Sequence, residues 1–222
     1  MSTIPRSQPS TGGSNAKGLA SGNPKGRGDT RARILDAAMG SFGSRGYDGT
    51  SLDALADLLG MRKQSILYWF PSKEVLLEAV IDQAAVDLAG VLEEALDGAG
   101  DGWLRVEAVV RSVFRLAASR PELLGLVREV SRLGPPAAAR FIGALDPLVV
   151  RASDFLIAEM DEGHMRHYEP RLLLLAIYST VIGMVTEVDV LKALGEEPTA
   201  RSLVRRRAEI LGLLRSALLP GP

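Results

Sequence analysis

The chain has 222 residues, of which 46% are hydrophobic, which is enough apolar sequence for one domain or two modest ones. It contains no cysteine, which excludes disulfide bonds and thiolate metal sites, and it has no apolar run long enough to cross a bilayer. The formal net charge of −1 is unevenly distributed along the chain. Residues 1–73 carry ten basic and five acidic side chains, and the remainder carries 16 basic and 22 acidic ones. The N-terminal third is therefore basic, as expected of a segment that binds a polyanion.

Residues 1–28 are rich in serine, glycine, proline and asparagine, and they contain four basic and no acidic residues. No periodic apolar pattern runs through them, so the composition predicts a disordered basic tail. Two interpretations of this tail stay open. It is either a plain solvated segment, or a basic arm that helps to hold nucleic acid through Lys25, Arg27, Arg31 and Arg33.

A first amphipathic helix is predicted from Asp29, which is a suitable capping residue. Apolar residues follow at four-residue steps, namely Ile34, Ala38 and Phe42. The stretch "SRGYDGT" ends the helix at its two glycines. A second helix is expected from Thr50, because Thr50-x-x-Asp53 has the pattern of a capping box.

Residues 51–59 and 62–70 form a pair of short predicted helices separated by Gly60, which permits a tight left-handed turn. This arrangement of a small residue, a glycine turn and a second helix is typical of a helix-turn-helix. At 100° per residue, Ile66 and Phe70 share the core face of the second helix, and Gln64 and Tyr68 point away from it. Pro71 ends this helix, and Ser72 can cap a long fourth helix that reaches about Leu96.

The outward face of the second helix suits a DNA major groove, where glutamine bonds adenine edges and arginine or lysine reaches guanine or phosphate. The stretch "TSLDALADLLGMRKQSILYWFPSKEVLL", together with the preceding "ILDAAMGSFGSRGYDGTS", resembles the DNA-binding signature of the TetR (tetracycline-repressor-like) family over about residues 30–78. Leu67 and Trp69 depart from the pattern, since the family often has tyrosine and histidine there.

The resemblance implies an all-α protein with an N-terminal helix-turn-helix DNA-binding domain and a C-terminal helical ligand-binding and dimerisation domain. The expected boundaries are residues 1–28 for the tail, 29–76 for the DNA-binding domain and 77–222 for the C-terminal domain. The residues expected to contact operator DNA are Thr50, Arg62, Lys63, Gln64, Ser65, Tyr68, Trp69 and Lys73, with Thr50 and Lys73 contacting phosphate.

The rest of the chain is predicted to form helices near residues 103–118, 121–133, 136–162, 171–191 and 200–218, and no sustained strand alternation is present. The helix at 171–191 is apolar on several sides, which predicts burial, and the helix at 200–218 has a broad apolar stripe. Two adjacent apolar helices at this end favour a homodimer that closes a four-helix bundle across a two-fold axis, although an ordinary intrachain core would give the same pattern.

A small-molecule effector is expected among the C-terminal helices, and it is expected to be apolar or amphipathic. The residues that could line its site, or could simply be core, are Trp103, Arg111, Phe114, Phe141, Phe155, Tyr178 and Met184. Pro147 lies inside an otherwise helical stretch, so a kink, or a break with Asp146 as a new cap, is predicted there.

No metal, cofactor or catalytic site is expected. His164 and His167 lie close to acidic residues in "DEGHMRHYEP", but a glycine and a proline mark this stretch as a loop, where polar residues are ordinary. The sequence therefore predicts a cytoplasmic, dimeric transcriptional regulator, most simply a repressor released by its effector. The alternatives are a DNA-binding regulator without a small-molecule effector, and a helical enzyme or ligand-binding protein whose helix pair is incidental.

Overall fold

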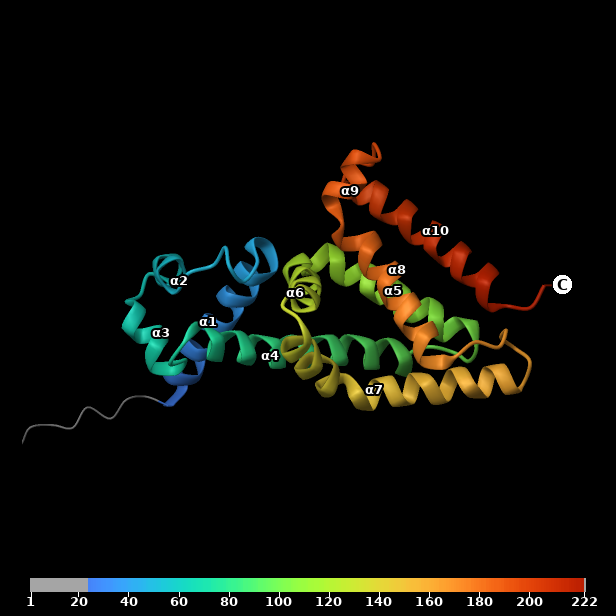
Figure 1. The fold of residues 1–222 in the computed structure, drawn as a ribbon, viewed down its shortest axis with the longest axis horizontal. Helices are drawn as coiled ribbons and strands as arrows, with labels where there is room; N and C mark the ends of the chain where they lie inside the picture. Colours follow the sequence, from blue (N-terminus) through green and yellow to red (C-terminus); the bar gives the residue numbers. More distant parts are fainter. Residues whose placement is uncertain (1–23, 222) are drawn as a thin grey trace, which may run out of the picture.

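The computed structural model describes residues 24–221, which form helices joined by short turns and contain no strand. The all-α prediction is confirmed for this part of the chain. The helices, coloured in chain order in Figure 1, are α1 Pro24–Arg45, α2 Leu52–Leu59, α3 Lys63–Trp69, α4 Lys73–Asp97, α5 Trp103–Ser119, α6 Pro121–Arg132, α7 Pro135–Asp161, α8 Pro170–Thr186, α9 Val188–Ala193 and α10 Ala200–Leu218. No helix in residues 24–221 combines the length and the apolar character that a membrane span requires.

The start of α1 corrects the predicted boundary of the tail. The helix begins at Pro24, so residues 24–28 are helical and Asp29 lies inside the helix instead of capping it. Proline is well suited to a first helical position, because its fixed φ is already helical and its missing N–H is not needed there. The predicted disorder of residues 1–23 lies outside the described residues.

Helices α1, α2 and α3 pack with the start of α4 into a small lobe, shown at the left of Figure 1. Its centre is apolar and buried, and it contains Ile34, Phe42, Leu55, Ile66 and Leu76. Helix α4 leaves this lobe and runs into a larger one, where it packs against α5 and α7. The long α4 is therefore shared between the two lobes.

The two lobes also meet where α6 crosses α1 (Figure 1). Gly43 of α1 and Gly125 of α6 face each other at this crossing, and a Cβ added at Gly125 would lie 2.3 Å from the carbonyl oxygen of Gly43. A side chain at either position would strike backbone atoms, so only glycine permits the observed approach of the two helices.

The predicted bounds of one helix in the larger lobe are wrong. The expected helix over 171–191 ends at Thr186, and α9 starts after Glu187, whose backbone is not helical. Arginines from other helices bond the carbonyls that this break exposes: Arg128 of α6 donates to Thr186 O, and Arg206 of α10 donates to Met184 O. Helix α7 continues through Pro147, so of the two alternatives predicted there, the break with Asp146 as a new cap is excluded.

The apolar sequence of α8 predicted a helix buried on all sides, but one side of the helix is exposed. Leu172 is 65% exposed, and it forms one open stripe with Leu175, Ala176 and Ser179 at helical spacing. Helix α10 packs on α5 and α8 through a buried stripe that includes Ile210, Leu214 and Leu218, which matches the predicted stripe in part. Beside this stripe the helix carries exposed apolar residues, such as Leu213 at 58% exposure.

Candidate nucleic-acid interface

The turn between α2 and α3 has the geometry that the sequence predicted. Gly60 has φ +63°, in the left-handed region, and the Met61 N–H donates to Ala56 O at 3.0 Å. Leu55 and Ala56 are buried, so α2 is fixed against the lobe. The side-chain oxygen of Ser51 accepts a hydrogen bond from the Ala54 N–H at 3.1 Å and caps the helix.

Helix α3 is held from behind and open in front. Ile66 and Phe70 are buried, and the Arg31 guanidinium lies over the Phe70 ring at 5.3 Å from its centroid. The predicted base-reading face is exposed, with Tyr68 at 70%. Arg62, Lys63, Gln64 and Ser65 are exposed as well. The helix can therefore present these side chains to a groove without loss of its own packing.

Asp53 and Trp69 contact two side chains of this face, Lys63 and Tyr68. Lys63 Nζ forms an ion pair with Asp53 of α2, at 2.9 Å from Oδ2, so part of its charge is engaged within the lobe. Trp69 is half-buried, and its ring meets the Tyr68 ring edge-on, with centroids 5.5 Å apart. Trp69 therefore limits the positions that Tyr68 can adopt.

Thr50 lies differently from the prediction. Ser51, not Thr50, is the N-cap of α2. Thr50 is 2% exposed, and its hydroxyl donates to Gly46 O at 2.9 Å. A phosphate contact through this hydroxyl would require that internal bond to break. Thr50 and Ser51 both carry a hydroxyl that can cap a helix, and the burial of Thr50, which leaves Ser51 as the cap, depends on tertiary packing.

At the start of α4, Ser72 is the predicted cap, and its side chain accepts from the Val75 N–H at 3.2 Å. Lys73 is the first residue of the helix, and its Nζ lies 3.9 Å from the centroid of the Tyr47 ring. The Tyr47 hydroxyl donates to Glu74 Oε1 at 2.9 Å. Hydrogen bonds from Ser72, from its own backbone amide and from Tyr47 hold the pKa of Glu74 below its usual range.

One exposed face of α3 thus carries Lys63, Gln64, Ser65 and Tyr68. Arg62 precedes this helix as its N-cap, and Lys73 begins the next helix. Residues 34–80 match the family model of bacterial regulatory proteins of the tetR family. Residues 34–80 therefore carry the DNA-binding domain of TetR-family transcriptional regulators. The assignment of individual base and phosphate contacts stays a prediction.

Similarity to TetR-family proteins extends beyond this lobe. The transcriptional regulator RutR of Escherichia coli K12 is 29% identical over 162 residues, covering 66% of this chain and 69% of RutR. A TetR regulator from Chloroflexus aurantiacus has the same fold, with a TM-score of 0.71 at 21% identity over 89% of this chain and 100% of that one. FadR of Bacillus subtilis, solved in complex with stearoyl-CoA, gives a TM-score of 0.68 at 19% identity over 82% of this chain and 96% of its own.

The predicted effector-lining residues are dispersed in the larger lobe. Phe114 and Phe141 are buried core residues, and Phe155 and Met184 are half-buried. Trp103 donates to Glu107 at 3.2 Å, and the Tyr178 hydroxyl lies 3.2 Å from Ser131 Oγ. These six side chains do not line either of the two best-formed hollows in the described part of the chain.

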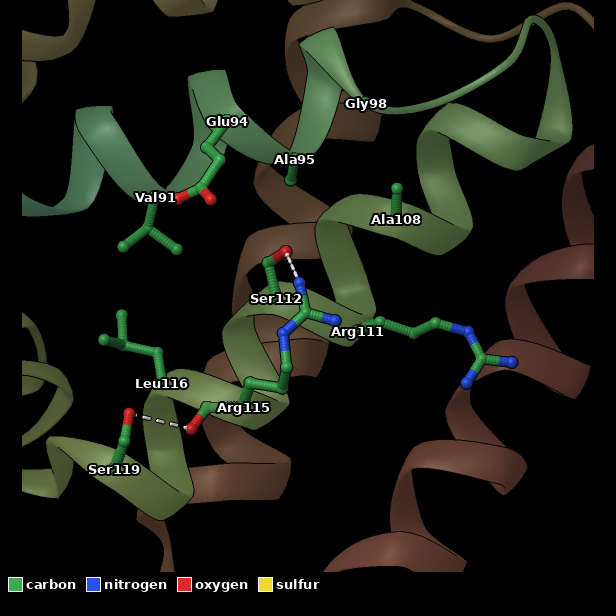
Figure 2. A pocket seen from close by; sticks show the side chains of 10 residues that line it. All are labelled: Val91, Glu94, Ala95, Gly98, Ala108, Arg111, Ser112, Arg115, Leu116 and Ser119. Atoms are coloured by element: carbon green, nitrogen blue, oxygen red, sulfur yellow. Dashed lines mark hydrogen bonds between the residues drawn. The ribbon is translucent and has the colours of Figure 1, made fainter.

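The larger hollow is a groove of about 630 Å³ between α4 and α5, drawn in Figure 2. Its lining includes one predicted residue, Arg111, whose side chain points away from Arg115 in Figure 2. Arg111 forms an ion pair with Glu107. The Arg115 side chain runs along α5 and donates to Ser112 Oγ of the same helix at 2.6 Å (Figure 2). Sequence reasoning sought large aromatics and missed this groove, because small residues create it: Ala95, Gly98, Ala108 and Ser112.

The histidine-containing loop has ordinary ion-pair geometry. His164 Nδ1 lies 3.2 Å from Glu162 Oε2 and 3.4 Å from Glu159 Oε2. Across residues 24–221, no three histidine or acidic side chains are grouped as metal ligands would be.

Proposed function

We propose that the chain is a homodimeric repressor that reads operator DNA through α3, contacts the DNA backbone at Lys73, and is released by a small apolar or amphipathic effector. The observation that carries the DNA-reading part is the division of α3 into two faces. Buried Ile66 and Phe70 fix the helix, and the exposed Gln64 and Tyr68 leave polar groups free for base edges.

Titration of the protein against DNA from the neighbourhood of its own gene, at several salt concentrations, tests this proposal. Gln64→Ala is expected to lower specific affinity by roughly 1–3 kcal/mol while affinity for random DNA stays. Lys73→Met is expected to weaken binding to all sequences and to reduce the salt slope by about one. An equal loss on specific and random DNA for Gln64→Ala would remove it from base reading.

The dimer proposal rests on the open face of α8 and α10. Leu172 and Leu175 on α8 and Leu213 on α10 are exposed apolar side chains on adjacent helices, and a second copy would cover them. In such a dimer the two α3 helices would lie roughly 34–36 Å apart, one turn of DNA. Leu175→Glu is expected to yield monomers in analytical ultracentrifugation. A fully dimeric variant would place the interface elsewhere.

The effector proposal rests on the groove between α4 and α5, whose volume is in the range of ligand sites, about 300–1,000 Å³. Val91 and Leu116 supply apolar wall, and Arg115 has no ion-pair partner among the described residues. Glu94 also lines the groove, so an amphipathic molecule with an anionic group fits this lining where that group meets Arg115 and not Glu94. Its binding shifts the equilibrium away from the DNA-bound state only by its difference in affinity for the two states.

Stearoyl-CoA, the ligand of the structurally similar FadR, is a direct first probe. Addition to the DNA complex is expected to release DNA from the wild-type protein and to release less from Arg115→Met. Release that is equal in the two proteins would place the site outside the groove. A regulator without a small-molecule effector would show no release with any apolar or amphipathic compound.

A further inference from the structure

Tyr47 makes more connections than its position in a surface turn suggests. It lies between α1 and α2, and its ring packs against Phe42 with the centroids 5.7 Å apart. The Tyr47 ring also meets Lys73, whose Nζ lies 3.9 Å from the ring centroid. That distance is well inside the range of about 6 Å over which an aromatic ring attracts a cation.

The tyrosine hydroxyl fixes the ring at a second point. It donates to Glu74 Oε1 at 2.9 Å, and Glu74 is the residue after Lys73 in α4. Burial, followed by the contact with Glu74, raises the pKa of Tyr47 to about 12, so the hydroxyl keeps its proton at neutral pH. The ring is therefore tied to the beginning of α4 both through its face and through its hydroxyl.

A third connection reaches the larger lobe. The Tyr47 N–H donates to Glu129 Oε1 of α6 at 2.8 Å. Glu129 is 8% exposed, and its other oxygen accepts from Arg132 at 3.0 Å. The preceding residue, Gly46, has φ +75°, and a Cβ there would lie 3.0 Å from the same Oε1. Backbone conformation and close approach both require glycine at this turn.

The charge of Lys73 is held differently from that of Lys63. Lys63 pairs with a carboxylate, which neutralises part of its charge. Lys73 forms no ion pair within 4 Å among the described residues, and a neutral ring holds it instead. The nearest carboxylate that acts on it is Glu74, which interacts with Lys73 by charge without forming an ion pair within 4 Å. The ring takes none of the ammonium N–H donors as a carboxylate would, so these donors stay available for a phosphate. A lysine held in this way also loses less side-chain entropy when it binds.

We propose that Tyr47 is a positioning residue for DNA binding: its ring holds the Lys73 ammonium in place for a backbone phosphate, and Glu129 of α6 fixes the ring. This inference rests on the proposed function, because it requires that Lys73 contact DNA. It adds a residue outside α2 and α3 to the interface, and it links that residue to a helix of the larger lobe.

The experiment measures binding of a random-sequence DNA duplex by fluorescence anisotropy over a range of salt concentrations. Tyr47→Leu removes the aromatic face and is expected to lower affinity by roughly two- to fivefold, with a smaller salt slope. Tyr47→Phe keeps the ring and is expected to restore both values. In the Lys73→Met background, Tyr47→Leu should cause no further loss, because the ring acts through that lysine.

A shape-preserving series guards against misfolding of Tyr47→Leu. Phenylalanine with increasing ring fluorination at position 47 keeps the packing and weakens the attraction for a cation, so affinity should fall stepwise with fluorination. On the other side, Glu129→Gln keeps an oxygen acceptor for the Tyr47 N–H, and Glu129→Leu does not. Only Glu129→Leu is expected to reproduce the two- to fivefold loss of Tyr47→Leu.

Wild-type affinity across the fluorinated series would overturn the proposal. A loss in Tyr47→Leu that persists undiminished without the Lys73 ammonium would overturn it as well. If Glu129→Leu binds DNA as the wild type does, the link to α6 is wrong. Failure of the proposed function looks different: the wild type would show no salt-dependent DNA binding, or Lys73→Met would keep the full salt slope, and the role of Tyr47 would fall with it.

Discussion

Gly43→Ala should separate the two lobes at the crossing of α1 and α6. A Cβ at Gly43 would lie 2.1 Å from Glu122 O and 2.9 Å from Glu122 C, both backbone atoms of α6. Ordinary contact begins at 3.4 Å, so the shortfall to the oxygen is 3.4 − 2.1 = 1.3 Å. Neither atom belongs to a flexible side chain, and the helices themselves must therefore move.

The expected cost is that of overpacking a tight contact, about 1–3 kcal/mol or more. Alanine also gains about 1 kcal/mol over glycine in a helix, which offsets part of that cost. Gly40 supplies the matched control, because it lies in the same helix and a Cβ there would meet nothing within 4 Å. Gly40→Ala should gain the helical term alone, so the difference between the two variants isolates the steric term.

Thermal unfolding at one fixed protein concentration measures this difference. For a chain of this size, 1 kcal/mol shifts Tm by roughly 2–4 °C, so Gly43→Ala should melt roughly 2–12 °C below Gly40→Ala. Equal melting temperatures for the two variants would refute the reasoning. They would mean that α6 can retreat from α1 at no cost, and that the crossing is not a fixed point between the lobes.

Three further outcomes are expected. Asp53→Asn frees Lys63 from its ion pair, so affinity for random DNA should rise by up to roughly fivefold, and an unchanged affinity in an anisotropy titration would contradict this. The raised pKa of Tyr47 means that its protonated hydroxyl stabilises the fold fully at pH values below about 10, the ordinary tyrosine pKa. This contribution is lost as the pH rises through about 12. Ultraviolet titration should show an ionisation near that pH in the wild type and not in Tyr47→Phe. Arg140 pairs with Asp82, and its hydrogen bonds lower the pKa of that carboxyl. Arg140→Met removes this contact, so the free energy of unfolding in denaturant titrations should fall by less than about 1 kcal/mol. The difference between wild type and variant should disappear as the pH falls below about 4, because Asp82 is then protonated.

The sequence predicted the features that depend on neighbours along the chain. Gly60 takes the left-handed turn, Ser72 caps α4, and Ile66 and Phe70 face the core, because each of these follows from local conformation or helical periodicity. The exposed face of α3 followed from the same periodicity. One local signal was misassigned: of two adjoining hydroxyl residues, Ser51 is the cap, and only packing decides between them.

The features that the sequence did not predict depend on contacts between distant segments. Helix α8 ends where Arg128 and Arg206, from two other helices, bond its last carbonyls. The link from Glu129 to Tyr47 spans 82 positions. A groove lined by small residues has no periodic signature either, because the space arises between two helices whose separation is fixed elsewhere. Apolar periodicity shows that a helix packs, but it does not show against what.

The short length of α3 explains why such distant contacts matter for DNA binding. With seven residues it is well below the roughly 12–15 that an isolated helix needs in water, so its position depends on the packing behind it. Helix α4 is part of that packing, and it carries Lys73 at its first residue and Val91 of the groove 18 residues later. At 1.5 Å per residue these two positions are about 27 Å apart on one helix. If α4 tilts by about 4° about the groove, its start at Lys73 moves by about 2 Å over that length, which is enough to break a hydrogen bond to phosphate. An effector in the groove therefore need not approach the DNA to weaken its binding.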